Sequence, residues 1–194
     1  MLFDMKNFGV MARFNTGLDA SMISNIKNYI AENNHRLQDA SVGINEHERV
    51  DRSVRNCSIF SIERPYWLTH ILNSYVHEVN QSVFKFDLTT WHSDLQYISY
   101  EGKGSGYMWH SDNEAEVNET GVRKLSLVLS LSDPNEYEGG EFQIMLNANK
   151  RMETFKFELG ECIIFPSTSL HRVRPLKSGK RTVIVGWYGG PDFR

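Results

Sequence analysis

The sequence predicts a mainly β protein of sandwich or barrel type, with helices ahead of the strands. Short apolar segments separated by turn residues recur at regular spacing through the second half of the chain, which is typical of all-β folds. One of them, residues 125–131, alternates leucines with Ser126, Val128 and Ser130, the two-residue period of a half-buried strand. Earlier in the chain, apolar residues recur at helical spacing. The expected class is therefore mainly β with flanking helices, an α+β fold.

Two helices are expected in the first half of the chain. The first has capping side chains at residues 18–21 and an apolar face formed by Met22, Ile23, Ile26, Tyr29 and Ile30. The second runs from Pro65, a residue that the first position of a helix tolerates, to about Gln81. Its apolar stripe comprises Trp67, Leu68, Ile71, Leu72, Tyr75, Val76 and Val79. We expect both helices to pack against one sheet.

Residues 33–55, between the two helices, are polar and lack a clear period, which predicts a long loop. It is either a segment that closes over a substrate or a plain solvent-exposed connection, and the sequence leaves both open. About eight strands are then expected, at residues 95–100, 106–110, 125–131, 140–146, 152–158, 161–165, 170–175 and 181–187. A cluster of turn residues at 133–136 ends the third of them.

Composition and charge narrow the function classes. The 194 residues are enough for one domain with a substantial core, and 40% of them are hydrophobic, as in globular proteins. A net charge of -3 gives no electrostatic argument for a nucleic-acid or membrane surface. No apolar stretch is long enough to span a bilayer, and the first residues do not form a signal peptide. Cys57 and Cys162 lack the number and spacing of a disulfide scaffold, so we expect a reducing cytoplasm.

The tetrapeptide Trp-His-Ser-Asp occurs twice, at residues 91–94 and at residues 109–112. A His and a carboxylate two residues apart lie on one face of an extended segment, so both can reach one metal ion. Together with a distant His, such a pair makes the facial triad of non-haem Fe(II) oxygenases. A His-x-Asp pair alone arises easily by chance. We predict that His92 of the first copy is a surface or loop residue, because no later ligand completes its set.

The second copy, with His110 and Asp112, is followed by residues that complete such a site. His171 comes after an apolar strand and a turn, and Arg181 opens a later apolar strand. An unpaired guanidinium on a buried strand is costly, and its planar fork matches a carboxylate. The natural partner is a dicarboxylate cosubstrate. The sequence therefore predicts a metal site at His110, Asp112 and His171, with a carboxylate clamp at Arg181.

These residues carry a family resemblance over roughly the last hundred residues. The segments 95–102, 107–112, 125–131, 139–142, 160–166, 171–173 and 179–181 resemble, in order and spacing, the prolyl-4-hydroxylase-like 2-oxoglutarate and Fe(II)-dependent dioxygenases. The chain is most similar to the small microbial and phage members, including the PKHD-type hydroxylases. Family members often have a further polar or aromatic contact on the strand after the His-x-Asp turn. This chain has Ser126, Val128 and Ser130 there.

The resemblance implies a double-stranded β-helix, or jelly roll, and a set of site residues. By it, His110, Asp112 and His171 bind Fe(II), Arg181 pairs with the distal carboxylate of 2-oxoglutarate, and Tyr100 adds a hydroxyl to that contact. It implies hydroxylation of a C–H bond with release of succinate and CO2, and ascorbate is a candidate reductant because some relatives use it. The implied domain is residues 1–194, with 1–90 as N-terminal helical and strand support and 91–194 as the catalytic core.

The leading hypothesis is hydroxylation of a prolyl, or another amino-acid, residue of a peptide or protein. One alternative keeps the chemistry on a free amino acid or small metabolite, and another is a jelly-roll binding module without activity. Nucleobase demethylation ranks lower because the chain lacks a broad basic face. Fold and metal centre do not identify the substrate, and the oligomeric state is equally open.

Overall fold

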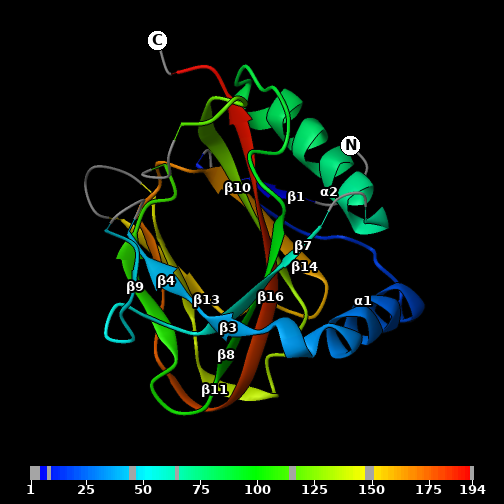
Figure 1. Ribbon diagram of the computed structural model, residues 1–194. Coiled ribbons are helices and arrows are strands. Elements are labelled where there is room, and N and C mark those ends of the chain that lie inside the picture. The colour runs from blue at the N-terminus through cyan, green and yellow to red at the C-terminus, as the bar shows by residue number, and fades with distance from the viewer. Residues whose placement is uncertain are drawn as a thin grey trace.

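A computed structural model describes residues 5–7, 10–43, 47–63, 66–113, 117–146 and 151–192. Two facing β-sheets form a jelly roll, and two helices cover the larger one (Figure 1). The nine-stranded sheet has the order β1-β2-β14-β10-β16-β8-β7-β3, with β11 beside β16, and the five-stranded sheet has the order β13-β12-β15-β9-β6. The predicted mainly β class and the jelly roll are confirmed.

The larger sheet is built from β1 (Met5–Asn7), β2 (Ala12–Asn15), β3 (Gln38–Asp39), β7 (Ser58–Ile62), β8 (Leu95–Glu101), β10 (Val122–Ser130), β11 (Tyr137–Gly139), β14 (Glu161–Pro166) and β16 (Leu176–Gly190). The smaller sheet comprises β6 (Arg55–Asn56), β9 (Gly106–His110), β12 (Phe142–Met145), β13 (Met152–Phe155) and β15 (His171–Val173). All eight predicted strands are present, with β10 and β16 longer and β12, β13 and β15 shorter than expected.

The two faces of the larger sheet bury different residues. Along β10, Leu125, Leu127 and Leu129 pack into a core shared with the helices, whereas Val128 packs into a second core shared with the smaller sheet. The alternation read from the sequence is therefore real, because successive strand side chains point to opposite faces. It also places Ser126 on the inner face, toward the space between the sheets.

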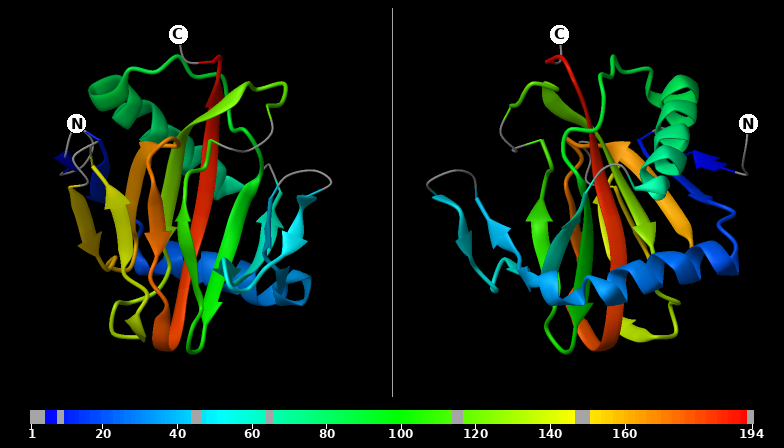
Figure 2. Two further views of the ribbon diagram at one scale, coloured as in Figure 1. Left: turned by 90° about the vertical axis from the view of Figure 1, so that its left-hand side faces the viewer. Right: turned by 45° about the vertical axis from the view of Figure 1, so that its right-hand side comes forward.

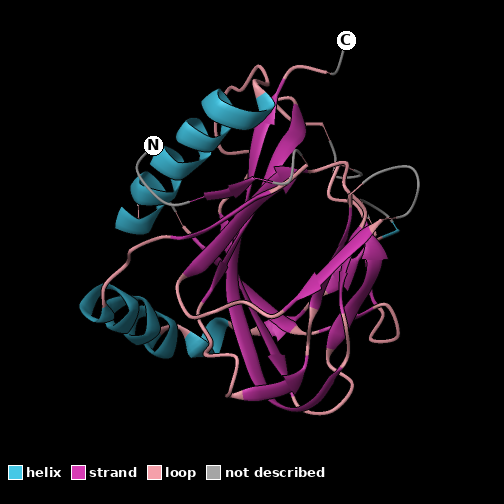
Figure 3. Ribbon diagram, turned by 180° about the vertical axis from the view of Figure 1, so that it is seen from behind, coloured by secondary structure: helices cyan, strands magenta, loops and turns pink. Residues whose placement is uncertain are grey.

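The helices α1 (Ala20–Glu32) and α2 (Trp67–Val79) lie on the outer side of the larger sheet, as predicted (Figure 3). The Asp19 carboxylate caps α1 by accepting a hydrogen bond from the Met22 amide at 2.9 Å. Pro65, the predicted first residue of the second helix, lies outside the described residues, and α2 begins at Trp67. A π-helical turn, Asn80–Phe84, carries the chain past the predicted end near Gln81.

Residues 33–55 do not form the predicted structureless loop. They contain a 3-10 turn (Asn34–Arg36), β3, and a hairpin of β4 (Ser41–Val42) with β5 (Arg49–Val50) that projects from one edge of the molecule (Figure 2). These elements are only two or three residues long, too short to show a period in sequence. None of the described helices is long and apolar enough to cross a membrane.

Gly186 in β16 lies directly beneath Trp91. A Cβ added at Gly186 would sit 2.6 Å from the Trp91 ring and 2.7 Å from the Leu95 side chain. We predict that Gly186→Ala lowers the free energy of unfolding by about 1–3 kcal/mol, because the core must shift to accept the methyl group. Equilibrium unfolding in urea measures this loss. An unchanged midpoint would show that Trp91 does not pack against this strand.

Candidate metal and cosubstrate site

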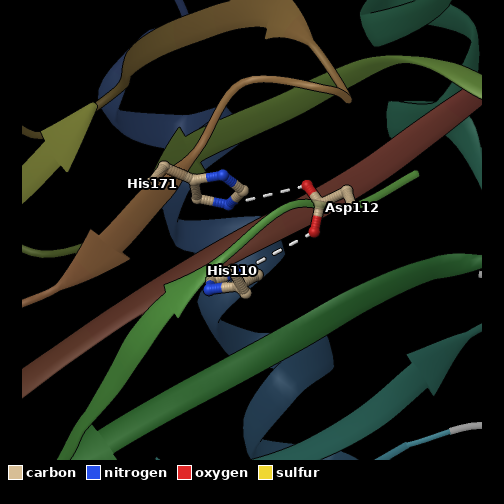
Figure 4. Close-up of side chains that lie close together, drawn as sticks. All are labelled: His110, Asp112 and His171. Atoms are coloured by element: carbon tan, nitrogen blue, oxygen red, sulfur yellow. Dashed lines mark ion pairs between the residues drawn. The ribbon is translucent and has the colours of Figure 1, made fainter. Parts of the chain in front are cut away.

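His110, Asp112 and His171 come together because β9 and β15 are neighbours in the smaller sheet. His110 ends β9, His171 begins β15, and the two are direct partners in the antiparallel register. Asp112 follows two residues after His110, and its carboxylate oxygens lie 3.7 Å from His110 Nε2 and 3.6 Å from His171 Nε2 (Figure 4). The ligating atoms of all three lie within 4.8 Å of one another.

Backbone carbonyls orient both imidazoles. The Nδ1 atom of His110 lies 2.8 Å from the Met108 carbonyl oxygen, and that of His171 lies 2.9 Å from the Ser169 carbonyl oxygen. A carbonyl oxygen only accepts hydrogen bonds, so each Nδ1 carries the proton. Each Nε2 then keeps its lone pair and points it toward Asp112. This is the usual arrangement of histidines that ligate metal ions.

Hydroxyl groups on the inner face of the larger sheet hold Asp112. Ser126 in β10 donates a hydrogen bond to Asp112 Oδ2 at 2.7 Å, and Ser126 Oγ lies 2.9 Å from Ser167 Oγ. The Asp112 amide donates to the Ser167 carbonyl oxygen at 2.8 Å. The carboxylate is therefore fixed by both its main chain and its side chain. Sequence reasoning did not assign Ser126 or Ser167 to the site.

The electrostatics of the cluster favour a neutral imidazole beside a carboxylate. Burial, together with the neighbouring His171, lowers the pKa of His110 to about 3. Burial raises the pKa of Asp112, but the two histidines and the Ser126 hydrogen bond outweigh this, and the pKa lies below its usual value. At neutral pH, His110 has a free lone pair and Asp112 is ionised, which is the state that binds a cation.

Arg181 carries a buried charge that has no hydrogen-bond partner among the described residues. Its side chain is 1% exposed on β16, and its guanidinium carbon lies 5.3 Å from the centre of the Tyr100 ring and 5.5 Å from that of Phe157. Among the described residues, none donates or accepts a hydrogen bond with any of its three guanidinium nitrogens. Burying an ion without a partner costs several kcal/mol, and a bound anion would offset this cost.

One cavity joins Arg181 to the cluster. It has a volume of about 680 Å³ and is lined by His110, Asp112, His171, Arg181 and Tyr100, among others. Tyr100 is the register partner of Arg181 across β8 and β16. Burial raises the pKa of Tyr100, so its hydroxyl stays protonated and can donate a hydrogen bond. The structure thus brings together all five residues that the sequence singled out.

The first tetrapeptide copy lies at the same cavity but outside the cluster. His92 precedes β8 in a loop, one of the two predicted places, and its side chain is buried at 8% exposure. Its amide donates to the Trp187 carbonyl oxygen at 2.8 Å, and Trp91 packs on Tyr188 with ring centres 5.2 Å apart. The chain is therefore held against β16 here. Ser93 and Asp94 line the cavity wall.

Comparison with known proteins agrees with the geometry. Residues 95–189, about half of the chain, match the family model described as the 2OG-Fe(II) oxygenase superfamily. Over this segment the chain is similar to that superfamily. Its members use Fe(II) and 2-oxoglutarate. The match begins with β8 and ends within β16, so it includes His110, Asp112, His171 and Arg181.

Relatives within the superfamily cover the same part of the chain. A PKHD-type hydroxylase of Colwellia psychrerythraea is 44% identical over 91 residues, 46% of this chain and 40% of the relative. A PKHD-type hydroxylase of Prochlorococcus marinus is 47% identical over 92 residues, 46% of this chain and 39% of the relative. The chain thus spans about two fifths of the length of the curated relatives it matches.

Solved structures share the fold over nearly the whole chain. A prolyl hydroxylase of Trichoplax adhaerens, described as in complex with a peptide fragment, has a TM-score of 0.77 at 18% identity, covering 94% of this chain and 84% of that one. A Pseudomonas putida prolyl-4-hydroxylase has a TM-score of 0.72 at 17% identity, covering 94% and 93%. At such identities the likeness establishes the fold.

The residues of this chain fit both groups that the superfamily uses. Two imidazole nitrogens and a carboxylate are the donor set of a mononuclear Fe(II) site with open positions. The unpaired guanidinium of Arg181 fits the distal carboxylate of 2-oxoglutarate, and the Tyr100 ring lies beside it. The fit comes from the chemistry of the donors and from an otherwise uncompensated buried charge.

The hydrogen bond from Ser126 to Asp112 predicts a measurable effect on metal affinity. We expect Ser126→Ala to weaken the binding of a divalent metal by about 10–100-fold, because the carboxylate loses its orienting partner. Titration with Zn(II) or anaerobic Fe(II) measures this. Ser130→Ala, on the same face of β10 but bonded to the Ser132 carbonyl oxygen, serves as the matched control. Equal affinities in the two variants would contradict this role of Ser126.

Proposed function

We propose that this chain is an Fe(II)- and 2-oxoglutarate-dependent dioxygenase that hydroxylates a C–H bond and releases succinate and CO2. In this proposal His110, Asp112 and His171 bind the metal, and Arg181, with Tyr100, binds the far carboxylate of 2-oxoglutarate. One observation carries it: a buried, unpartnered guanidinium lines the same cavity as a cluster of two imidazoles and a carboxylate.

The residues of the chain position the metal, the cosubstrate and the substrate, and the bound metal and cosubstrate supply the oxidation of the C–H bond. The two carbonyl-bound imidazoles and the Ser126-bound carboxylate present three ligands on one side, which leaves the opposite side open. Arg181 fixes the far end of the cosubstrate by a two-pronged, charge-assisted hydrogen bond. Trp187 and Tyr107 are among the other residues that line the cavity and bound the space left for a substrate.

For the substrate, we propose a prolyl, or another amino-acid, residue of a peptide or protein. Support comes from the names of the relatives, which are PKHD-type hydroxylases, and from the Trichoplax structure described as a complex with a peptide fragment. The cavity is also roomy, at about 680 Å³, and it opens beside the β4–β5 hairpin, which contributes Ser41, Val42 and Glu48 to its lining. An extended peptide chain could lie along this rim.

A second candidate is the same chemistry on a free amino acid or a small metabolite. It is favoured by a solved structure with TM-score 0.70 and 12% identity, described as an α-ketoglutarate-dependent carbocyclase from nogalamycin biosynthesis. A jelly-roll binding module without activity is disfavoured because the metal cluster and the buried arginine are both intact.

We further propose that residues 1–194 act as one domain, with residues 91–194 as the catalytic core and residues 1–90 as its support. Strands from the first part enter both sheets: β2 pairs with β14, β7 pairs with β8, and β6 pairs with β9. The supporting segment therefore completes the sheets on which the site is built.

The role of Arg181 predicts a selective loss of cosubstrate binding. Arg181→Gln should raise the Kd for 2-oxoglutarate by about 10–1,000-fold, because a buried charge-assisted pair is lost. Zn(II) affinity should stay unchanged, because Arg181 does not touch the metal ligands. Calorimetric titration of the Zn(II)-loaded protein with 2-oxoglutarate measures the first effect, and titration of the metal-free protein with Zn(II) measures the second. An unchanged Kd would mean that another cation binds the cosubstrate.

The assignment of the metal site to the second tetrapeptide predicts which variants lose the metal and which keep it. His110→Ala, Asp112→Ala and His171→Ala should each abolish tight metal binding and turnover, since each removes one of three ligands. His92→Ala should keep the metal, because His92 lies outside the cluster. Metal content after dialysis measures this. Loss of metal from folded His92→Ala alone would show that the wrong copy had been chosen.

Turnover itself is tested by succinate formation from 2-oxoglutarate, offered with proline-containing peptides, free amino acids and a cell extract. We expect succinate to rise with a peptide substrate, and mass spectrometry to locate the added oxygen. Oxygen added only to a free amino acid would favour the second candidate. Binding of metal and 2-oxoglutarate without succinate from any of these would favour the binding module.

A further inference from the structure

Two further guanidinium groups, those of Arg55 and Arg123, line the cavity beside the metal cluster. We propose that they form a subsite for a carboxylate of the substrate, so that the substrate is an acidic molecule rather than a neutral one. This inference rests on the proposed function and names the chemical class of its substrate. It is separate from Arg181, whose charge is assigned to the cosubstrate.

Arg123 is held in place by contacts that leave the end of its fork free. Its guanidinium carbon stacks 3.9 Å from the centre of the Trp187 ring, and its Nε lies 3.4 Å from His92 Nδ1. The part of the chain that the structure describes offers no hydrogen-bond partner to its two terminal nitrogens. A stacked guanidinium that lines a cavity is preorganised for a planar, two-oxygen anion.

Arg55 enters the cavity from the smaller sheet. It is bonded only to neutral acceptors: Nη1 donates to the Ser41 carbonyl oxygen at 3.2 Å and Nη2 donates to Gln96 Oε1 at 2.9 Å. Its Nε is buried and has no hydrogen-bond partner among the described residues. The guanidinium carbon lies 4.9 Å from the centre of the Tyr107 ring. Arg55 is thus a fixed, largely buried charge that is not neutralised.

The two arginines act on one region next to the reacting centre. Tyr107, over which Arg55 lies, stacks on His110 with ring centres 3.5 Å apart and planes 15° from parallel. Burial lowers the pKa of Arg123, the Asp112 carboxylate raises it, and the positive charge of Arg55 lowers it, so the two arginines interact electrostatically. Like charges brought together in a buried space are costly unless an anion lies between or beside them.

The described residues do not supply that anion. Glu48 and Asp94 also line the cavity, but across the described residues no carboxylate lies within ion-pair distance of Arg55 or Arg123. Asp112 contributes to the electrostatics of Arg123, but its oxygens face the two histidines and Ser126. A carboxylate of the substrate would compensate both arginines. It could be an acidic side chain in a peptide or the α-carboxylate of a free amino acid.

The test uses protein loaded with Zn(II) and 2-oxoglutarate, which fills the metal and Arg181 sites and prevents turnover. Calorimetric titration compares acetyl-Glu-Pro-Gly-amide with acetyl-Gln-Pro-Gly-amide, and acetyl-proline with acetyl-prolinamide. The first pair tests an acidic side chain and the second tests an α-carboxylate. We expect the acidic member of at least one pair to bind about 10–100-fold more tightly, as for hydrogen bonds to a charged group.

The variants Arg55→Gln and Arg123→Gln should each reduce that preference about tenfold or more, with little change for the neutral probe. Arg123→Lys should restore part of it, because the charge returns without the fork. Arg174→Gln is the matched control, since Arg174 is half exposed, pairs with Glu141 at 3.6 Å and lies outside the cavity. If Arg55→Gln fails to fold, as judged by its thermal transition, the Arg123 variants carry the test.

Equal binding of acidic and neutral probes, no binding of any acidic probe, or a preference that survives in both glutamine variants would overturn the subsite. Titration with 2-oxoglutarate in the same experiment separates this failure from that of the proposed function. Tight 2-oxoglutarate binding without acid preference would remove the subsite alone. Failure to bind 2-oxoglutarate at all would remove the dioxygenase proposal.

Discussion

The pairing of β9 with β15 is the constraint on which the site depends. In this antiparallel register His110 and His171 are direct partners, one at the end of its strand and the other at the beginning. A shift by one residue would turn one imidazole to the opposite face of the sheet. The carbonyl oxygens of Met108 and Ser169, each two residues before its histidine, then fix the rings with their Nε2 atoms toward Asp112. Backbone geometry thus sets the ligand geometry.

The inner face of the larger sheet carries residues of the site, and its outer face packs against the helices and stabilises the fold. On β16, Ile184 and Tyr188 belong to the core shared with the helices, while Val183, Val185 and Arg181 face the other sheet. The same division places Ser126 on the inner face of β10, next to Asp112. Because leucines and helices pack on the outer face, the sheet is rigid, and the polar residues of its inner face are held in position.

Much of this could be predicted from sequence. The eight strands and both helices follow from periodicity and turn residues. His110, Asp112, His171 and Arg181 follow from their residue types and spacing, whereas Tyr100 follows only from the family resemblance. The strands β3 to β6 could not, because two-residue elements carry no period and form only through their partners. The burial of His92 escaped prediction for a related reason. Its place depends on a main-chain bond to Trp187 and on the stacking of Arg123, contacts between residues far apart in sequence.

The charged residues of the cavity together determine which ligands it can bind. The cavity is lined by the two imidazoles and the Asp112 carboxylate of the metal cluster and by three arginines, none of which has an ion-pair partner among the described residues. A metal, a keto-diacid and an acidic substrate would complete this set. The most direct measurement is an anaerobic crystal structure with Fe(II) and 2-oxoglutarate. We expect iron on His110, Asp112 and His171 and the distal carboxylate of 2-oxoglutarate on Arg181. Iron bound elsewhere, or a distal carboxylate away from Arg181, would overturn the proposed site.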